Sequence, residues 1–133
     1  MSGHQQFSEA KMLIPNLVLL YVEDPQRSSA FYEKLFGVPP KANFPTYVAF
    51  AFETGLAIGL WSTRAKNFVS SGSGHRSEIT FMVADDQRVR DVHERWVRSG
   101  VLIEQPMHEA VFGLTFVAID PDGHRIRVCT PDE

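Results

Sequence analysis

The sequence has a single cysteine and no excess of positive charge. Cys129 cannot form a disulfide bond within the chain, so we expect a reducing, cytoplasmic environment. The formal net charge of −3 gives no electrostatic attraction to nucleic acids or anionic membranes. No apolar run approaches the roughly 20 residues needed to cross a bilayer, and the polar first residues lack a signal peptide's apolar stretch. We therefore predict a cytoplasmic protein with neither a nucleic-acid nor a membrane partner.

Familiar catalytic motifs are also missing. The sequence contains no glycine-rich phosphate loop, no serine–histidine–aspartate signature and no CxxC pair. Five histidines are present, but none stands at the local spacing expected of paired metal ligands. They are His4, His75, His93, His108 and His124. The absence of these motifs predicts that no cofactor is bound, and each histidine is best interpreted as an ordinary surface residue.

The composition that remains is that of a small globular protein. Hydrophobic residues make up 44% of the 133 residues and charged residues 22%, which argues against wholesale disorder. This length suits one compact unit, or two very small modules that share a core.

The first half of the chain has the pattern strand, helix, strand, strand. Asp24 is the expected N-cap of the helix, Pro25 its first residue and Gly37 its C-terminal end. Glycine in the short loop over residues 53–55 favours a hairpin. The expected elements are a buried strand over residues 13–22, a helix with its apolar face at Ala30, Phe31, Leu35 and Phe36, and strands over residues 47–52 and 56–61.

The second half repeats this pattern. A strand over residues 78–83 leads to a helix that opens at Asp85 and ends at Gly100, with Val89, Val92, Trp96 and Val97 at helical spacing. Strands follow over residues 114–119 and 125–129. Two similar halves can bury a shared core that neither could build alone. We therefore divide the chain into a flexible tail (1–12), a first module (13–66), a glycine- and serine-rich linker (67–76) and a second module (77–133).

Several short motifs resemble those of the vicinal-oxygen-chelate superfamily, which includes glyoxalases, bleomycin-resistance proteins and extradiol dioxygenases. They are Val22-Glu23-Asp24, Ser29-Ala30-Phe31-Tyr32, Phe36-Gly37 and Asp120-Pro121-Asp122-Gly123-His124. The resemblance implies an α+β fold, in which two βαβββ modules form a curved mixed-sheet half-barrel cavity that is completed in a dimer.

A narrower resemblance is to superfamily members that bind griseoluteate-type phenazine antibiotics. The matching segments are residues 14–17, 47–50, 77–79, 112–116 and 120–129. This resemblance implies a homodimer that sequesters its ligand without a metal, and so confers antibiotic resistance.

Metal-dependent members of the superfamily place one His or Glu ligand at each of four strand positions. Aligned on the motifs above, these positions hold Leu17, Gly59, Glu78 and Arg127. Leucine and glycine have no donor atom, and arginine is a permanent cation. Because a catalytic metal needs about three protein ligands, the alignment predicts that no metal is bound.

A slot with an aromatic edge is expected where the metal would have been. If Gly59 faces the cavity, strand alternation places Trp61 on the same face, and hairpin pairing adds Ala49 and Tyr47. Phe50 and Phe52 should then point into the layer packed by the helix. Phe44 and Phe112 are further candidates for the entrance of the cavity. Trp61 would stack on a planar ligand, although both Trp61 and Tyr47 can also be read as ordinary core aromatics.

Glu78 and Arg127 are expected to form a half-buried ion pair that replaces the metal, with Ser77 and Arg76 as further polar candidates. The function we favour is metal-free sequestration of a planar, phenazine-like antibiotic by a non-catalytic homodimer. The alternatives are a metal-dependent glyoxalase- or dioxygenase-type enzyme, a metal-free enzyme that uses Glu78 as a general base, and a module without a ligand.

Overall fold

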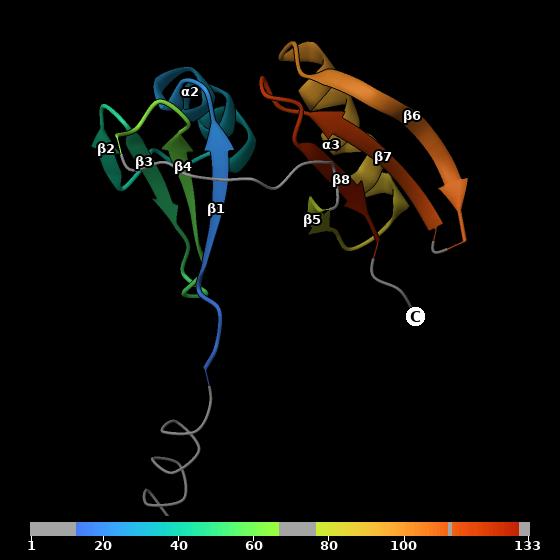
Figure 1. Cartoon of the computed structure of the whole chain (residues 1–133). Helices are drawn as coiled ribbons and strands as arrows, with labels where there is room; N and C mark the ends of the chain where they lie inside the picture. The colour runs from blue at the N-terminus through green and yellow to red at the C-terminus, as the bar shows by residue number, and fades with distance from the viewer. Residues whose placement is uncertain (1–12, 67–76, 112, 131–133) are drawn as a thin grey trace, which may run out of the picture.

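The computed structural model describes residues 13–66, 77–111 and 113–130, and in these residues eight strands form two four-stranded sheets (Figure 1). One helix packs against each sheet. The first module consists of β1 Leu17–Val22, α2 Pro25–Phe36, β2 Ala42–Phe44, β3 Tyr47–Ala51 and β4 Ala57–Ser62. The second consists of β5 Glu78–Met82, α3 Asp86–Arg98, β6 Leu102–Ala110, β7 Gly113–Ile119 and β8 Arg125–Cys129. The predicted tail, the predicted linker and Phe112 lie outside the described residues.

The two modules have the same topology. The strand orders are β1-β4-β3-β2 and β5-β8-β7-β6. In each sheet the first and last strands of the module are parallel neighbours, and the remaining pairs are antiparallel. The predicted α+β fold of two βαβββ modules is therefore confirmed.

Local chemistry places the ends of the elements as expected. The Asp24 carboxylate accepts hydrogen bonds from the backbone N–H groups of Gln26 (3.0 Å) and Arg27 (3.4 Å), and Pro25 begins α2. Gly37 ends α2 with a φ of 75°, a left-handed conformation that glycine adopts without strain. In the hairpin between β3 and β4, Gly55 has a φ of 97°. The N-cap of α3 is Asp85, as predicted, whereas its C-cap is Ser99, one residue before the predicted Gly100.

Other sequence predictions were wrong. The first strand begins at Leu17 rather than residue 13, and of its six residues only Val22 is buried. The pattern also missed β2, which is only three residues long, and β6, whose pairing with β7 is interrupted by register shifts that break strand alternation. On the helices, Ala30 is exposed and Val97 is half exposed. The inner face of α2 instead buries Ser28 and Tyr32.

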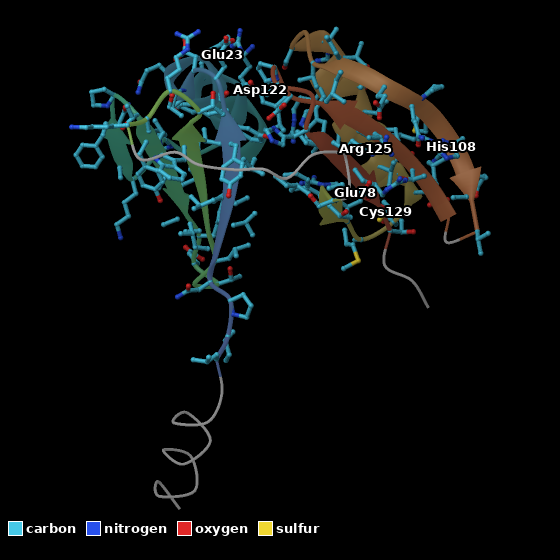
Figure 2. The ribbon with its side chains drawn as sticks, viewed as in Figure 1. Glu23, Glu78, His108, Asp122, Arg125 and Cys129 are labelled. Carbon is cyan, nitrogen blue, oxygen red and sulfur yellow. The ribbon has the colours of Figure 1, made fainter. Side chains whose placement is uncertain are left out.

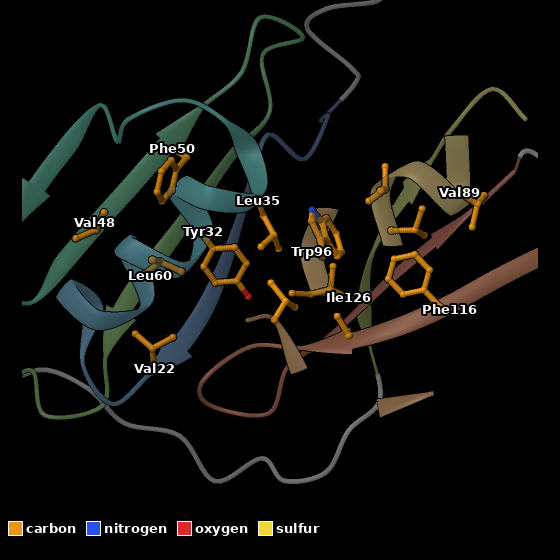
Figure 3. Close-up of a cluster of buried hydrophobic side chains, with 14 of the residues drawn as sticks. Val22, Tyr32, Leu35, Val48, Phe50, Leu60, Val89, Trp96, Phe116 and Ile126 are labelled. Atoms are coloured by element: carbon orange, nitrogen blue, oxygen red, sulfur yellow. The ribbon is translucent and has the colours of Figure 1, made fainter. Parts of the chain in front are cut away.

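A continuous apolar core joins the two modules on the helix side of both sheets (Figure 3). The rings of Phe36 and Phe81, one from each module, lie 6.1 Å apart. Phe50 is fully buried, and the rings of Phe50 and Phe52 both contact Phe36 edge-on, so the prediction that they face the helix layer is confirmed. Each buried side chain of this size stabilises the fold by about 1.5–3 kcal/mol. Within the described parts of the chain, no helix covers the opposite face of either sheet.

A group of buried hydrogen bonds also joins the second module to α2 of the first module. The side chain of Asp120, at the end of β7, is fully buried. Its carboxylate accepts hydrogen bonds from the Tyr32 hydroxyl (2.7 Å) and from two backbone N–H groups, those of Asp122 and His124 (both 2.8 Å). It also contacts the His124 ring nitrogen at 2.8 Å. We call these three side chains, Asp120, Tyr32 and His124, the latch.

Asp122 reinforces the latch from the same turn. Its carboxylate accepts hydrogen bonds from the backbone N–H of Glu23 (3.0 Å) and the hydroxyl of Ser28 (3.2 Å). Figure 2 shows Glu23 and Asp122 beside each other where the modules meet. The turn between β7 and β8 is therefore held against the start of α2, which fixes the position of β8 in the molecule.

The contacts within the latch lower the pKa of Asp120 and raise the pKa values of His124 and Tyr32. Burial alone would raise the pKa of Asp120, but hydrogen bonds from His124 and Tyr32 outweigh burial and hold that pKa below 3.8, its ordinary value. The hydrogen bond to Asp120 raises the pKa of His124 above 6.5, its ordinary value, although burial partly opposes this. Burial, followed by the nearby Asp120 charge, strongly raises the pKa of Tyr32, so its hydroxyl stays a donor.

We expect the stability of the protein to fall as the pH rises above 6.5, the ordinary pKa of histidine. The raised pKa of His124 means that its contribution is complete below the unfolded-state pKa and is lost as the pH rises through the folded-state pKa. The Asp120 contribution behaves oppositely, being lost only as the pH falls through its depressed pKa. Urea unfolding at several pH values measures the slope. His124→Gln, which keeps a donor without the titratable charge, should flatten it; an unchanged slope in this variant would contradict the assignment.

Candidate ligand-binding site

An aromatic row crosses the open face of the first sheet. In the strand register Tyr21 is opposite Trp61, Trp61 is opposite Tyr47, and Tyr47 is opposite Phe44. One aromatic side chain thus comes from each of the four strands, and at about 4.8 Å between strands the row is roughly 14 Å long. The expected pairs Tyr47–Trp61 and Ala49–Gly59 are confirmed.

The next row on the same face consists of smaller side chains. Leu19 is opposite Gly59, Gly59 is opposite Ala49, and Ala49 is opposite Ala42. Above these two rows is a hollow of about 360 Å³, which lies at the lower end of the range for small-molecule pockets. Its lining residues are Leu17, Leu19, Tyr47 and Trp61.

The lining of this hollow is apolar and reaches solvent. Leu17 is 44% exposed, Leu19 42% and the neighbouring Tyr21 45%. Exposed apolar side chains that are contiguous mark a surface that is covered by a ligand or a partner. The rings of Tyr21 and Trp61 meet edge to face, with their centroids 6.2 Å apart.

Tyr21 was missed by sequence reasoning. Alternation along β1 places Tyr21 on the same face as Leu17 and Leu19, but its pairing with Trp61 depends on the parallel register between β1 and β4. That register joins strands separated by the whole of α2, and no turn chemistry specifies it. The β3–β4 hairpin, in contrast, sets its own register through a short loop.

The open face of the second sheet is charged rather than apolar. The Glu78 carboxylate accepts a hydrogen bond of 2.6 Å from Nε of Arg127, with their side chains 28% and 17% exposed, which confirms the predicted half-buried ion pair. Thr115 Oγ1 lies 3.1 Å from the Arg127 guanidinium and accepts from it. Arg125 joins the cluster by contacting both Glu78, at 3.5 Å, and Glu104 (Figure 2).

The electrostatics of Glu78 disfavour a role as a general base. Burial would raise its pKa, but hydrogen bonds from Arg127, Thr80 and Arg125, together with the Arg127 charge, lower it below its ordinary value. A general base works best when its pKa is close to the operating pH. The hypothesis of a metal-free enzyme needed a raised pKa at Glu78, but the pKa of Glu78 is lowered.

We expect Glu78 and Arg127 to be coupled in a double-mutant cycle. Glu78→Gln and Arg127→Met should each lower the free energy of unfolding. In the double variant the decrease should be about 1 kcal/mol smaller than the sum of the two single decreases, because either single substitution already breaks the ion pair. Urea unfolding of the four proteins measures this coupling. Glu94→Gln with Arg98→Met, an exposed pair on α3, is the matched control and should couple more weakly. Strictly additive losses at Glu78 and Arg127 would contradict the pair.

The four positions that the sequence alignment assigned to the family's metal ligands do not fit a metal here. Leu17 and Gly59 lie in the first sheet and offer no donor atom, while Glu78 and Arg127 lie in the second and neutralise each other. Within residues 13–66, 77–111 and 113–130, no three His, Cys, Asp or Glu side chains gather as a ligand set. At the four aligned positions a divalent cation would find one carboxylate, that of Glu78, and this carboxylate is already paired with the Arg127 guanidinium.

The other predicted site residues are placed as follows. Ala49 is half-buried in the small-residue row, and Phe44 is 59% exposed at the outer end of the aromatic row. Ser77 is exposed and immediately precedes β5. Arg76 and Phe112 lie outside the described side chains. The structure thus gathers Trp61, Tyr47, Gly59 and Ala49 on one sheet, and Glu78 and Arg127 on the other.

Comparison with known proteins identifies the family. Residues 14–128 match the model of the Glyoxalase/Bleomycin resistance protein/Dioxygenase superfamily, and the chain belongs to this superfamily. A curated relative is the phenazine antibiotic resistance protein EhpR of Enterobacter agglomerans, which is 34% identical over 124 residues, covering 90% of this chain and 94% of EhpR.

Solved structures show the same fold. Protein ATC0852 of Agrobacterium tumefaciens is 38% identical, with a TM-score of 0.79 over 90% of this chain and 98% of that one. A glyoxalase/bleomycin resistance protein/dioxygenase family enzyme of Burkholderia phytofirmans is 19% identical, with a TM-score of 0.73 over 87% and 98% of the two chains. At that identity the similarity concerns the fold alone. Neither helix of the described residues is long and apolar enough to cross a membrane.

Proposed function

We propose that this protein binds and sequesters a planar aromatic antibiotic of the phenazine type, without a metal and without chemical conversion, and thereby confers resistance in the cytoplasm. The observation that carries the proposal is the solvent-open apolar hollow bordered by Tyr47 and Trp61. The similarity to a phenazine antibiotic resistance protein supports the same ligand class. The low pKa of Glu78 and the unsuitable metal positions favour binding over catalysis.

Sequestration needs only affinity, which a flat apolar surface supplies. A fused-ring ligand removes apolar area from water and stacks on an indole or phenol ring, which adds roughly 0.5–1.5 kcal/mol per aromatic pair beyond area burial. Few polar groups are then needed to orient the ligand. Glu78 and Arg127 are the polar groups that we assign to this task, through contacts with a ligand carboxylate or ring nitrogen.

A homodimer would bring the apolar and the charged half-sites together. The open face of the first sheet provides Leu17, Leu19 and Trp61, whereas that of the second provides Glu78 and Arg127. Both β1 and β5 are edge strands with exposed side chains, and such edges are normally covered. We propose that the first module of one copy faces the second module of another. Sedimentation at micromolar concentration should give twice the mass of one chain; the mass of a single chain would contradict this arrangement.

Fluorescence titration tests the proposed function. Phenazine-1-carboxylate should quench Trp61, which is half-buried at the hollow, while Trp96 is buried in the core and should respond little. Trp61→Phe should therefore bind the ligand with most of the quenching lost. Anthracyclines, bleomycins and glutathione adducts are the comparison ligands. The proposal fails if none of the phenazines binds, or if protein purified without chelator carries about one equivalent of a transition metal in the cavity.

A further inference from the structure

We propose that Gly59 and Tyr47 are a specificity-determining pair, which sets the depth of the slot and restricts it to flat, fused-ring ligands. This inference rests on the proposed function, because it names the ligand shape that the same site admits. Gly59 leaves the space in which the Tyr47 ring lies, and this ring forms the bottom of the slot, which we call the floor.

The space above Gly59 is occupied by the Tyr47 side chain. A Cβ atom built on Gly59 would lie 2.8 Å from both Cε1 and Oη of Tyr47 and 2.8 Å from a methyl group of Leu19. Such distances are shorter than carbon and oxygen atoms tolerate without moving, since the optimum is about 3.5–4.0 Å. Any residue with a side chain at position 59 would therefore displace the ring.

Backbone conformation does not explain the glycine. Gly59 lies within β4 and is not among the glycines with positive φ, so an L-residue could adopt its conformation. Glycine in a strand interior costs stability, and it is retained there when another group must approach the backbone closely. The group that approaches here is the Tyr47 ring.

The ring position determines how much room a ligand has. Tyr47 and Trp61 are opposite each other on β3 and β4, and both line the hollow together with Leu17 and Leu19. With Tyr47 lying across Gly59, the hollow keeps its volume of about 360 Å³. A raised Tyr47 would project into this volume. A ligand that rests on the Tyr47 ring gains stacking only if it is flat, because a saturated ring holds its neighbour away from offset contact.

A matched pair of ligands measures this selectivity. Phenazine and 1,2,3,4-tetrahydrophenazine share a three-ring skeleton, but one terminal ring of the second compound is saturated and puckered. We expect the parent protein to bind phenazine at least tenfold more tightly. Tyr47→Ala should weaken phenazine binding and lower the ratio of the two dissociation constants, because one of the two stacking surfaces is removed while Trp61 remains. Val97→Ala, half exposed on α3, is the control and should leave the ratio unchanged.

Gly59→Ala tests the other member of the pair. Its methyl group should lift Tyr47 into the hollow and weaken the binding of both compounds tenfold or more. In the double variant Gly59→Ala/Tyr47→Ala no ring remains to be lifted and only the Leu19 methyl group still has to move, so its affinities should lie much closer to those of Tyr47→Ala than additive losses would place them. Isothermal titration gives the affinities, and circular dichroism confirms that each variant folds. If Gly59→Ala does not fold, the change of ratio in Tyr47→Ala decides the proposal alone.

The outcomes separate this inference from the proposed function. A parent protein that binds neither compound overturns both. A parent that binds both compounds equally well, a ratio unchanged in Tyr47→Ala, or additive losses in the double variant overturns only the role of Gly59 and Tyr47, and leaves the proposed function standing.

Discussion

Replacing Trp61 with alanine is expected to weaken phenazine binding by about 1–3 kcal/mol while leaving the fold intact. Trp61 lies at the centre of the aromatic row, between Tyr21 and Tyr47, and it lines the hollow. Its removal takes away the largest flat surface on the open face. Because Trp61 lies on the face of the sheet opposite α2, the core loses little packing when its side chain is removed. Isothermal titration with phenazine-1-carboxylate measures the loss, and thermal unfolding measures the fold.

Two further variants show whether the loss comes from stacking. Trp61→Phe keeps a smaller ring and should recover part of the affinity. Tyr21→Phe removes a hydroxyl but keeps the ring that meets Trp61 edge-on, so it should bind nearly as well as the parent. If Trp61→Ala binds as tightly as the parent protein, the ligand does not lie on the open face of the first sheet.

Replacing Asp120 with alanine should destabilise the protein by about 3–5 kcal/mol, the cost of removing one member of a buried charged contact. The buried carboxylate accepts a hydrogen bond from the Tyr32 hydroxyl, and removing the carboxylate leaves that hydroxyl without this partner inside the core. The backbone N–H groups of Asp122 and His124 lose the same acceptor. Urea unfolding, monitored by circular dichroism, measures the difference in the free energy of unfolding.

Tyr32→Phe is the matched control for this prediction. It removes one hydrogen bond to the carboxylate but leaves His124 and the backbone donors in place, so a loss of about 1–2 kcal/mol is expected. A loss below about 1 kcal/mol in Asp120→Ala would show that the latch does not hold the modules together. Since β8 follows the latch directly and carries Arg125 and Arg127, a loosened latch should also weaken ligand binding.

Much of the first module could be predicted from residues close together in the sequence. The helix begins where an Asp–Pro pair can cap it and ends where Gly37 adopts a left-handed conformation. The hairpin loop before Leu56 fixed the pairing of Tyr47 with Trp61, because a loop this short allows only one register between the two strands. The Glu78–Arg127 pair was also predictable, once the family's topology placed β5 beside β8.

Other features depend on contacts between distant segments. The sequence pattern placed β1 in the core, because its run of apolar residues is typical of a buried strand. That run instead provides the open face at Leu17 and Leu19, where apolar side chains line a hollow. Tyr32 was not among the predicted apolar-face residues, yet it is fully buried, and the partner of its hydroxyl, Asp120, is 88 residues away in the sequence.

The sequence by itself determined the repeat, the helix ends, the hairpin register and the lack of a donor atom at Leu17 and Gly59, since each follows from neighbouring residues or from the alignment on the family motifs. Only the tertiary structure decided that Tyr47 lies across Gly59, that Tyr21 extends the aromatic row and that Asp120 closes the latch. The physical reason is that these contacts join side chains from different strands and modules. Their geometry depends on parallel register and on packing across the whole molecule, which no local pattern specifies.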